Sequence, residues 1–398
     1  MKCNRYKIKD LISEISMGPF GSNIKVECLV DSGIPVLNGS NLTGFALNDS
    51  SFRYVTEEKA NSLGKANAHR GDVVITHRGT LGQIAFIPPD SKFERYIISQ
   101  SQFRVKCNEK VMPEYLTYYF HTKIGQHKLL SNASQVGVPA LARASTTFQE
   151  LEIEIPPMTQ QQKVVSLLET IRVKIELNNA INDNLEQQAQ AIFRRELLRN
   201  GELPPNWTTG SLLDIANYLN GLAMQKFRPV DGESGLPVLK IKELRQGFCD
   251  YGSELCSQNI KPEFIVHDGD VIFSWSGSLL VDLWCGGACG LNQHLFKVTS
   301  DKYPKWFYYA WTAHHLARFV AIAADKATTM GHIKREDLAK AEVIIPNTAS
   351  MERIGGVLEP IYDLIINQRI EHRKLSMLRD ALLPKLMSGE LDVSAIEL

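Results

Sequence analysis

The chain has 398 residues, of which 44% are hydrophobic and 22% charged, a composition typical of a globular protein with two or three domains. Its 44 basic and 44 acidic residues give a formal net charge of zero, which excludes a nucleic-acid binder that works by bulk charge alone but not one with local basic patches. No apolar run approaches the ~20 residues of a membrane span. The N-terminal MKCNRYKIKD lacks the apolar core of a signal peptide, so we expect no secretion.

The cysteines predict reduced thiols in a cytoplasmic protein, because the 7 of them are odd in number and scattered along the chain. The tightest pair is Cys285 and Cys289, and only His294 lies close enough to join it. A structural zinc site needs four placed ligands, so the sequence predicts no metal site.

The N-terminal part of the chain, residues 1–155, is typical of a mixed domain rich in loops. Short apolar runs bounded by glycine and proline predict strands at residues 71–75 and 83–87. Alternation predicts a third strand at residues 103–107, and helical spacing follows over residues 114–130. The segment is therefore α+β.

A long helix is predicted next, over residues 160–198, from apolar residues that recur at steps of three and four. The seam residues that we expect to pair are Val164, Leu168, Ile171, Ile175, Leu185 and Ile192. Asn178 and Asn182 make the centre of this seam polar. Such a helix is roughly 58 Å long at 1.5 Å per residue, and it cannot bury its apolar stripe alone.

The second half of the chain repeats the first at a slowly drifting offset. Gly33-Ile-Pro-Val-Leu matches Gly235-Leu-Pro-Val-Leu, and Gly71-Asp-Val-Val-Ile-Thr matches Gly269-Asp-Val-Ile-Phe-Ser. Small steps in the offset are expected of loop deletions in a duplicated unit. The sequence therefore predicts an internal duplication.

The repeat extends to a second long helix with the same pattern. Its expected seam residues are Ile354, Leu358, Ile361, Ile365, Leu375 and Leu382. Gln368 and His372 are polar at the positions that match Asn178 and Asn182, and matched polar positions usually fix the register of a helix pair. Pro360 lies inside this helix and predicts a possible kink.

The predicted fold class is α+β, with two similar mixed domains, two long coiled-coil helices that pack together, and a pseudo-two-fold internal repeat. The predicted division places the first domain at residues 1–155, a helical spacer at 156–203, the second domain at 204–345 and a second helical spacer at 346–398.

Two similar heads on a rigid helical spacer suit a ligand that is long and periodic, such as duplex DNA, in which two half-sites lie about one turn (34–36 Å) or more apart. Heads that are similar but not identical predict two different half-site sequences, because base contacts come from side chains that differ. The geometry leaves open a second hypothesis, a duplicated scaffold that binds protein or carbohydrate and has no role on DNA.

The candidate DNA-binding residues lie in polar loops at matched places in the two halves, where arginine and lysine can bind guanine or phosphate and amides can bind adenine. In the first half they are Lys25, Asn38, Ser40, Asn41, His77, Arg78, Thr80, Gln100 and Gln102. In the second half they are Lys226, Arg228, Lys240, Lys242, Trp275, Ser276, Ser278, Gln293 and His294. A plain hairpin with solvated polar residues explains the loop at residues 77–80 as well, an exposed strand position explains Gln100 and Gln293, and Trp275 also fits a core position.

The chain resembles the specificity (S) subunit of type I restriction-modification systems over essentially its whole length. The resemblance is carried by Gly-Ile-Pro-Val-Leu-x-Gly-Ser-Asn-Leu at residues 33–42 and Arg-Gly-Asp-Val-Val-Ile-Thr-x-Arg-Gly-Thr-Leu-Gly at residues 70–82. An Ile-Pro-Pro before the first long helix, the stretch at residues 15–22 and the ending at residues 382–391 support it.

The resemblance implies that each mixed domain is a target-recognition domain that reads one half of a bipartite, asymmetric DNA site. The two helices would then be antiparallel, set the spacing of the half-sites and dock two methyltransferase (M) subunits. It implies further partners, the restriction/translocase (R) subunits, and no membrane. S-adenosylmethionine, ATP and Mg²⁺ would belong to the partners, and this chain would have no cofactor and no catalytic residue. A modification factor that works with a methyltransferase alone, without cleavage, fits equally.

The motifs agree with a non-catalytic chain. A phosphate-binding loop needs Gly-Lys followed by Ser or Thr, but Gly64-Lys65 is followed by Ala66. The Asn/Asp-Pro-Pro-Tyr/Phe motif of amino-methyltransferases is missing as well.

Overall fold

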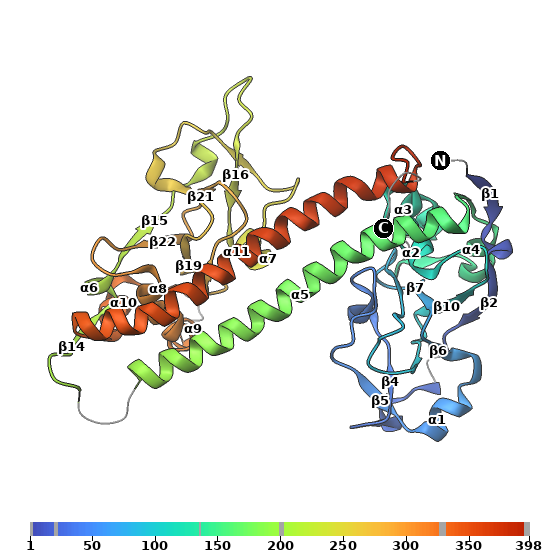
Figure 1. The fold of residues 1–398 in the computed structure, drawn as a ribbon, viewed down its shortest axis with the longest axis horizontal. Helices are drawn as coiled ribbons and strands as arrows, with labels where there is room; N and C mark the ends of the chain where they lie inside the picture. The colour runs from blue at the N-terminus through green and yellow to red at the C-terminus, as the bar shows by residue number, and fades with distance from the viewer. Residues whose placement is uncertain (1–2, 20–22, 135–136, 199–202, 326–331, 394–398) are drawn as a thin grey trace. The chain divides into compact units, whose positions relative to one another are not determined.

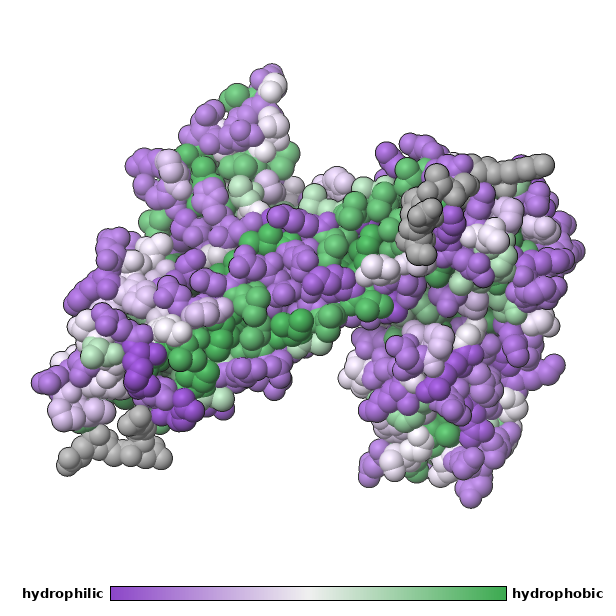
Figure 2. All heavy atoms as spheres, in the orientation of Figure 1, coloured by the Kyte–Doolittle hydropathy of each residue, from purple (hydrophilic) through white to green (hydrophobic). Residues whose placement is uncertain are grey.

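The computed structural model describes residues 3–19, 23–134, 137–198, 203–325 and 332–393 (Figure 1). The chain forms two compact units: unit 1 holds residues 1–172 and 378–398, and unit 2 holds residues 173–377. Both boundaries fall inside the long helices, so each unit takes part of each helix, whereas the sequence assigned the helices to regions of their own. Hydrophilic residues cover much of the face seen in Figure 2, and hydrophobic residues gather along the long helices.

Unit 1 is built on a four-stranded antiparallel sheet in the order β2-β10-β7-β8. The strands are β2 (Ile12–Met17), β10 (Gln102–Cys107), β7 (Asp72–Thr76) and β8 (Ile84–Phe86), and the three strands that the sequence predicted are confirmed within one residue. The predicted helix at 114–130 is two helices, α2 (Pro113–His121) and α3 (Lys123–Leu130). They separate because Thr122 is extended and its Oγ1 accepts a hydrogen bond from the Gly125 amide (3.0 Å), which caps α3.

A five-stranded sheet in the order β3-β5-β4-β9-β6 makes up the rest of the unit 1 framework. Its strands are β3 (Leu29–Val30), β5 (Arg53–Val55), β4 (Ile34–Val36), β9 (Arg95–Ile97) and β6 (Asn67–His69). Smaller elements are β1 (Asn4–Lys7), β13 (Glu152–Ile155), β11 (Ala133–Ser134), β12 (Ala140–Leu141), α1 (Glu57–Ser62) and α4 (Ala144–Glu150). Short 3-10 turns lie at Ile8–Asp10, Val26–Cys28, Gly39–Leu42 and Gly64–Ala66.

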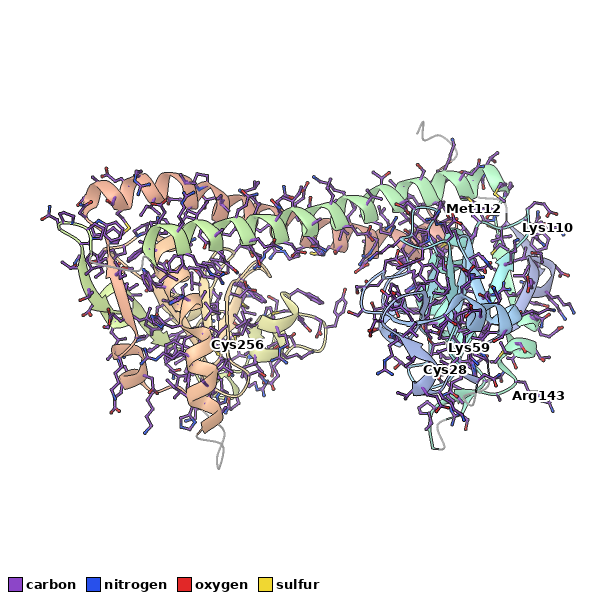
Figure 3. The ribbon with its side chains drawn as sticks, turned by 90° about the horizontal axis from the view of Figure 1, so that it is seen from below. Cys28, Lys59, Lys110, Met112, Arg143 and Cys256 are labelled. Atoms are coloured by element: carbon purple, nitrogen blue, oxygen red, sulfur yellow. The ribbon has the colours of Figure 1, made fainter. Side chains whose placement is uncertain are left out.

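The first long helix, α5 (Met158–Leu197), is anchored to unit 1 at its beginning. The Gln161 side chain is buried, accepts a hydrogen bond from the Met112 amide (3.0 Å) and donates to the carbonyls of Lys110 (2.8 Å) and Pro156 (3.0 Å). Met112 and Lys110 are labelled near this end of α5 in Figure 3. One glutamine thus joins the loop before α2 to the start of the long helix.

Unit 2 repeats this plan. Its antiparallel sheet runs β15-β22-β19-β20, with β15 (Asn217–Asn220), β22 (Leu295–Thr299), β19 (Val271–Ser274) and β20 (Leu280–Leu283). Its second sheet runs β17-β16-β21-β18, with β17 (Leu255–Cys256), β16 (Leu236–Leu239), β21 (Cys289–Leu291) and β18 (Ile265–Val266). The other elements are β14 (Thr208–Ser211), β23 (Glu342–Ile345), α6 (Leu212–Ile215), α7 (Ile241–Gln246), α8 (Lys305–His314), α9 (Leu316–Asp325) and α10 (Arg335–Ala339), with 3-10 turns at Met224–Lys226 and Pro262–Phe264.

The two four-stranded sheets confirm the duplication that the sequence predicted. β2, β10, β7 and β8 occur in the same spatial order and with the same antiparallel pairing as β15, β22, β19 and β20. In each unit a helix hairpin follows the sheet along the chain. The predicted fold class, α+β with two similar domains and two long helices, is confirmed.

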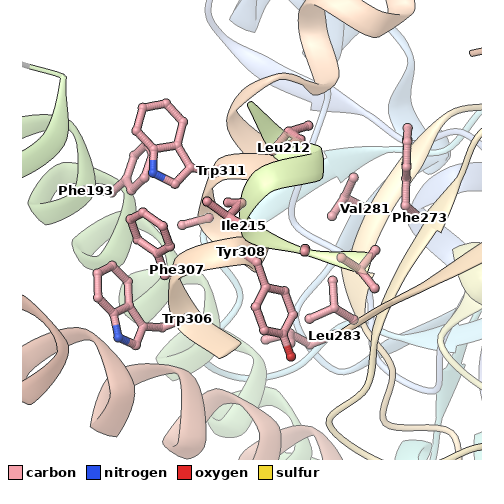
Figure 4. Packing of buried hydrophobic residues seen from close by; sticks show 14 of the residues in the cluster. Phe193, Leu212, Ile215, Phe273, Val281, Leu283, Trp306, Phe307, Tyr308 and Trp311 are labelled. Atoms are coloured by element: carbon pink, nitrogen blue, oxygen red, sulfur yellow. The ribbon is translucent and has the colours of Figure 1, made fainter. Parts of the chain in front are cut away.

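The core of unit 2 is aromatic and centres on α8 (Figure 4). Trp306, Phe307 and Trp311 of α8 are almost fully buried, and Phe193 of α5 packs edge-on against Trp311 with ring centroids 5.1 Å apart. Large aromatic side chains contribute much of the apolar area that a core buries. The end of α5 is therefore part of the core of unit 2.

Within unit 2 the long helices α5 and α11 (Thr348–Met387) are antiparallel. Glu196 Oε2 accepts from Arg353 Nη2 (2.7 Å), and Glu186 Oε1 accepts from Arg369 Nη2 (2.6 Å). Glu196, the later residue of α5, meets Arg353, the earlier residue of α11, while Glu186 meets Arg369. Only an antiparallel pair of helices gives this order of contacts. In unit 1, Val164 of α5 belongs to the same buried cluster as the last turns of α11.

The seam residues differ in burial along the two helices. Those that are buried are Val164, Leu168, Ile171, Ile175, Ile354, Leu358 and Ile365, and those that are partly buried are Leu185, Ile192, Ile361, Leu375 and Leu382. At the polar centre, Asn178 is fully buried and its Nδ2 donates to Glu371 Oε2 (2.8 Å). The side-chain oxygens of Asn178, Asn182 and Gln368 are buried without a hydrogen-bond partner among the atoms described. Buried polar side chains without partners lower the stability of a helix pair. In coiled coils such residues often fix the register of the two helices.

Pro360 does not interrupt α11, which continues as a helix over Thr348–Met387. The residue four positions earlier is Gly356, whose carbonyl receives no helical hydrogen bond from position 360 because proline has no amide hydrogen.

No helix in the described part of the chain is long and apolar enough to cross a membrane. The same residues contain no group of three or more His, Cys, Asp or Glu side chains placed to hold a metal ion.

Candidate nucleic-acid interface

In unit 1 the candidate loops meet at one end of the four-stranded sheet. The amide of His77, just after β7, donates to the Ser101 carbonyl (2.8 Å), and the amide of Gly18, just after β2, donates to the Gln102 carbonyl (2.8 Å). Loops from three strands therefore close against one another. We refer to this set, residues 18, 38–41, 77–83 and 99–102, as the unit 1 edge; Phe20, Gly21 and Ser22 of the motif at 15–22 lie outside the described residues.

Gly18 makes this closure possible. A Cβ at this position would overlap the carbonyl oxygen of Ser99, so no side chain fits. The glycine lets two backbone segments touch, and it brings the turn before β10 against the end of β2.

Gln83 joins the turn at residues 38–41 to the same edge. Its Oε1 accepts from Thr76 Oγ1 (3.3 Å), and its Nε2 donates to the Gly39 carbonyl (3.0 Å). Sequence reasoning missed Gln83, because nothing in its local pattern marks a residue that bridges two loops more than forty positions apart.

The exposed candidates of the unit 1 edge are Asn38, Ser40, Arg78, Thr80 and Gln100. Asn41 is instead fully buried: its Oδ1 accepts from the Asn38 amide (3.0 Å), and its Nδ2 donates to the carbonyls of Asn48 and Ser50 (2.9 Å each). Gln102 is buried as well, and its Oε1 accepts from the Ser99 amide (2.9 Å). The Asn41 amide and Gln102 Oε1 therefore bind backbone groups, whereas Gln102 Nε2 is buried without a hydrogen-bond partner among the described atoms.

His77 is half-buried beside this turn. Its Nε2 lies 3.2 Å from the Gln100 carbonyl oxygen, and burial lowers its pKa below the usual value, with the nearby Arg78 charge acting in the same direction. The imidazole is therefore neutral near pH 7, and the positive charge of this turn is that of Arg78.

A second arginine belongs to this region. The Gly79 amide donates to the Pro139 carbonyl (2.9 Å), and Arg78 forms an isolated β-bridge with Ala140. The same loop ends at Arg143, which is exposed and left-handed (φ 48°), and which Figure 3 shows at the outer surface. The contact of this loop with Arg78 is at Ala140, and no local sequence signal indicated it.

The unit 2 edge, residues 220–222, 275–278, 292–294 and 332, has the same construction. Gly221 repeats Gly18, because a Cβ there would overlap the Asn292 carbonyl oxygen, and its amide donates to the Leu295 carbonyl (3.0 Å). Ser276 forms an isolated bridge with His332, as Arg78 does with Ala140. The backbone of the edge is therefore repeated.

The side chains of the unit 2 edge are aromatic and polar. Trp275 is half-buried; its Nε1 donates to Asn220 Oδ1 (3.0 Å), and its ring centroid lies 5.6 Å from that of Phe296 and 6.3 Å from that of His294. Ser276 Oγ lies 3.1 Å from His294 Nδ1. Trp275 thus packs partly on the core and partly lines the edge. It combines the core position and the contact position that the sequence left as alternatives. Ser278 is exposed and Gln293 is partly buried.

The remaining candidate cations, apart from Lys226, are paired with acids. Lys25 lies 3.5 Å from Glu27, Arg228 lies 3.2 Å from Glu254, and Lys242 lies 3.0 Å from Asp250. Lys240 also pairs with Glu254, and Lys226 is exposed in a 3-10 turn. A cation that faces a carboxylate presents a weaker field to a phosphate than an unpaired one.

Comparisons with known proteins agree on one family. A family model described as the type I restriction modification DNA specificity domain matches residues 6–187 and 204–373. The MjaIX type I restriction enzyme specificity subunit of Methanocaldococcus jannaschii is 25% identical, with 98% of this chain and 94% of that protein covered. The HindI specificity subunit of Haemophilus influenzae is 19% identical over 81% of this chain and 87% of that protein. A crystal structure of the S subunit from M. genitalium is 12% identical, has a TM-score of 0.62 and covers 97% of this chain and 96% of that one.

Proposed function

Because the chain belongs to the family of type I restriction-modification DNA specificity proteins, we propose that it selects the DNA sequence on which a partner methyltransferase acts. Each unit reads one half of a bipartite, asymmetric site through its edge. One observation carries this proposal: Gly18 and Gly221 close the same loops in both units, while the side chains that these loops present differ. A repeated backbone with changed side chains is what two unlike half-sites require. The scaffold hypothesis has no comparable support.

The long helices α5 and α11 set the half-site spacing and dock two methyltransferase subunits. Exposed apolar residues on both helices support a docking role, among them Val173 and Leu177 of α5 and Val357 and Leu364 of α11. Figure 2 shows hydrophobic residues gathered along the long helices. The partners bring S-adenosylmethionine, ATP and Mg²⁺, restriction/translocase subunits join them, and the assembly works in the cytoplasm.

Methylome sequencing of cells that carry this chain and its cognate methyltransferase tests the reading function. Replacement of residues 1–155 by the same segment of a relative changes one half of the methylated sequence and leaves the other half as it was. Replacement of residues 204–345 is the matched control and changes the opposite half. A change of both halves by either replacement contradicts the proposal.

The helices are tested by inserting seven residues into each of them at matched seam positions. A heptad adds about 10 Å of helix, or about 3 base pairs of B-DNA, and preserves the seam. We expect both half-site sequences to stay and the spacer between them to lengthen. An unchanged spacer rules out the spacing role.

The net charge of zero predicts that the isolated chain binds DNA weakly and in a salt-sensitive way, because partners supply much of the phosphate neutralisation. Binding measured by fluorescence anisotropy at several salt concentrations checks this. Tight, sequence-specific binding without partners at physiological salt contradicts it.

A further inference from the structure

A cavity of about 590 Å³ opens in unit 2 where the last turns of α5 face α8 and α9. Its apolar lining comes from Phe193, Ala310, Ala313, Ala317 and Val320. Three alanines and an exposed valine leave room that larger side chains would fill. The cavity lies next to the aromatic core of Figure 4, to which Phe193 belongs.

The duplication shows what the same place contains in unit 1. Along the repeat, Tyr119 of α2 takes the position of Ala310, and Leu383 of α11 takes the position of Phe193. Tyr119 and Leu383 are each 6% exposed and lie in one buried cluster. In unit 1 the Tyr119 side chain therefore fills the space that Ala310 leaves empty in unit 2.

The rim of the cavity is basic. Arg194 and His314 line it and are exposed, and the Arg194 charge adds to desolvation in lowering the pKa of His314. The one acid in the lining, Glu186, is engaged by Arg369 (2.6 Å). An apolar floor with a guanidinium at its rim complements a helix that carries apolar anchors and an acidic residue beside them.

The long helix α5 forms one wall of the cavity, because Gln190, Phe193 and Arg194 lie on its last turns. A partner that covers the last turns of α5 therefore meets the cavity.

We propose that this cavity anchors an acidic amphipathic helix of one methyltransferase subunit, and that the two docking places on the chain are therefore unequal. The inference rests on the proposed function and names a site for its partner. The docking place in unit 2 binds a methyltransferase subunit more tightly than the place in unit 1. The small side chains in unit 2 admit apolar anchors that Tyr119 excludes in unit 1. Assembly is then stepwise, with the unit 2 place filled first.

The direct test is Ala310→Tyr, which gives unit 2 the residue that unit 1 uses. Native mass spectrometry and titration calorimetry of the full chain with its cognate methyltransferase subunit give the number and affinity of bound subunits. We expect two unequal sites in the wild type and at least a 10-fold loss in the tighter one in Ala310→Tyr. Tyr119→Phe, which keeps the size of the unit 1 side chain, leaves both sites as they are.

A surface variant keeps the test independent of folding. Arg194→Gln removes the rim charge from an exposed position, and we expect about a 3-fold loss in the tighter site that disappears at high salt. Arg195→Gln removes a neighbouring charge that does not line the cavity and is the matched control.

Two equal sites in the wild type, or an Ala310→Tyr protein that is folded and binds both subunits with wild-type affinity, overturns the inference and leaves the proposed function intact. A small acidic compound that copurifies with the wild type and is lost in Ala310→Tyr also overturns it, as does self-association of the chain through this site. A wild-type chain that binds no methyltransferase overturns both proposals.

Discussion

In unit 1 the turn after β7 carries His77 and Arg78, whereas in unit 2 the turn after β19 carries Trp275 and Ser276. Both turns are held by a glycine in close contact with the neighbouring turn, Gly18 in one unit and Gly221 in the other. The edges therefore share a backbone and differ in the groups they present, a guanidinium in unit 1 and an indole in unit 2.

The two four-stranded sheets also differ in a matched ion pair. Arg104 of β10 is buried between Asp72 (3.2 Å) and Glu14 (2.9 Å), and its repeat counterpart, Lys297 of β22, reaches Asp270 (2.8 Å). Arginine and lysine thus fill matched places in two copies of one sheet, with two carboxylates in unit 1 and one in unit 2. The four predictions that follow test the comparison between the units.

The largest expected effect is on stability in unit 1. Arg104→Ala leaves Asp72 buried and without its cation, which typically costs about 3–5 kcal/mol of unfolding free energy. Lys297→Ala costs about 1–3 kcal/mol, because Asp270 is more exposed and closer to water. Denaturant unfolding of both variants checks this order of the two losses in unfolding free energy, and equal losses contradict it.

The loss in Arg104→Ala also depends on pH. Burial raises the pKa of Asp72, and the Arg104 charge opposes that rise. The loss of unfolding free energy in Arg104→Ala is therefore smaller at acid pH, where Asp72 is protonated.

The second prediction concerns target recognition. Arg78→Glu replaces an exposed guanidinium by a carboxylate, and we expect methylation of the cognate site to fall about 10- to 100-fold, with the discrimination lost in the half read by unit 1. Ser278→Glu, at an exposed place in the unit 2 turn, adds a negative charge without removing a cation and has a smaller effect. Methylation rates on cognate and half-substituted duplexes check this, and unchanged methylation removes Arg78 from the interface.

The third prediction concerns the indole of unit 2. Trp275→Phe keeps a ring against Phe296 but loses the hydrogen bond to Asn220 Oδ1. We expect the unfolding free energy to fall by about 1 kcal/mol, measured by denaturant unfolding. A double-mutant cycle with Asn220→Ala isolates that bond, since the second substitution has little further effect if the two side chains act through it. Additive losses contradict the assignment.

The smallest expected effect is the response to mild acid. Desolvation lowers the pKa of His121 in unit 1 and of His315 in unit 2, although each imidazole lies 2.8 Å from a carbonyl oxygen. The unfolded chain takes up these protons near pH 6.5 and the folded chain at lower pH, so stability falls as the pH drops below about 6.5. Thermal unfolding between pH 7.5 and 5.5 checks this, and His315→Gln reduces the slope by about a degree or two of Tm. A slope that is the same in wild type and His315→Gln contradicts it.

The sequence by itself determined the duplication, the strands and the long helices, because these depend on repeats and on periodicity along a few consecutive turns or strands. The glycine-bounded strands and the first long helix were predicted to within a few residues, and the predicted seam residues of the second helix all lie inside α11. The break at Thr122 escaped prediction, because the residues on both sides have helical spacing and only the cap chosen by the side chain separates the helices.

Only the tertiary structure decided which polar residues face outward at the edges. Asn41 and Gln102 matched a pattern for base contact, yet the Asn41 amide and Gln102 Oε1 bind backbone groups of nearby residues. Gln83 had no pattern and joins the unit 1 edge to a turn distant in sequence. The reason is physical: a local pattern records which face of an element is apolar, whereas the partners of a polar side chain are set by segments that meet only when the chain is folded.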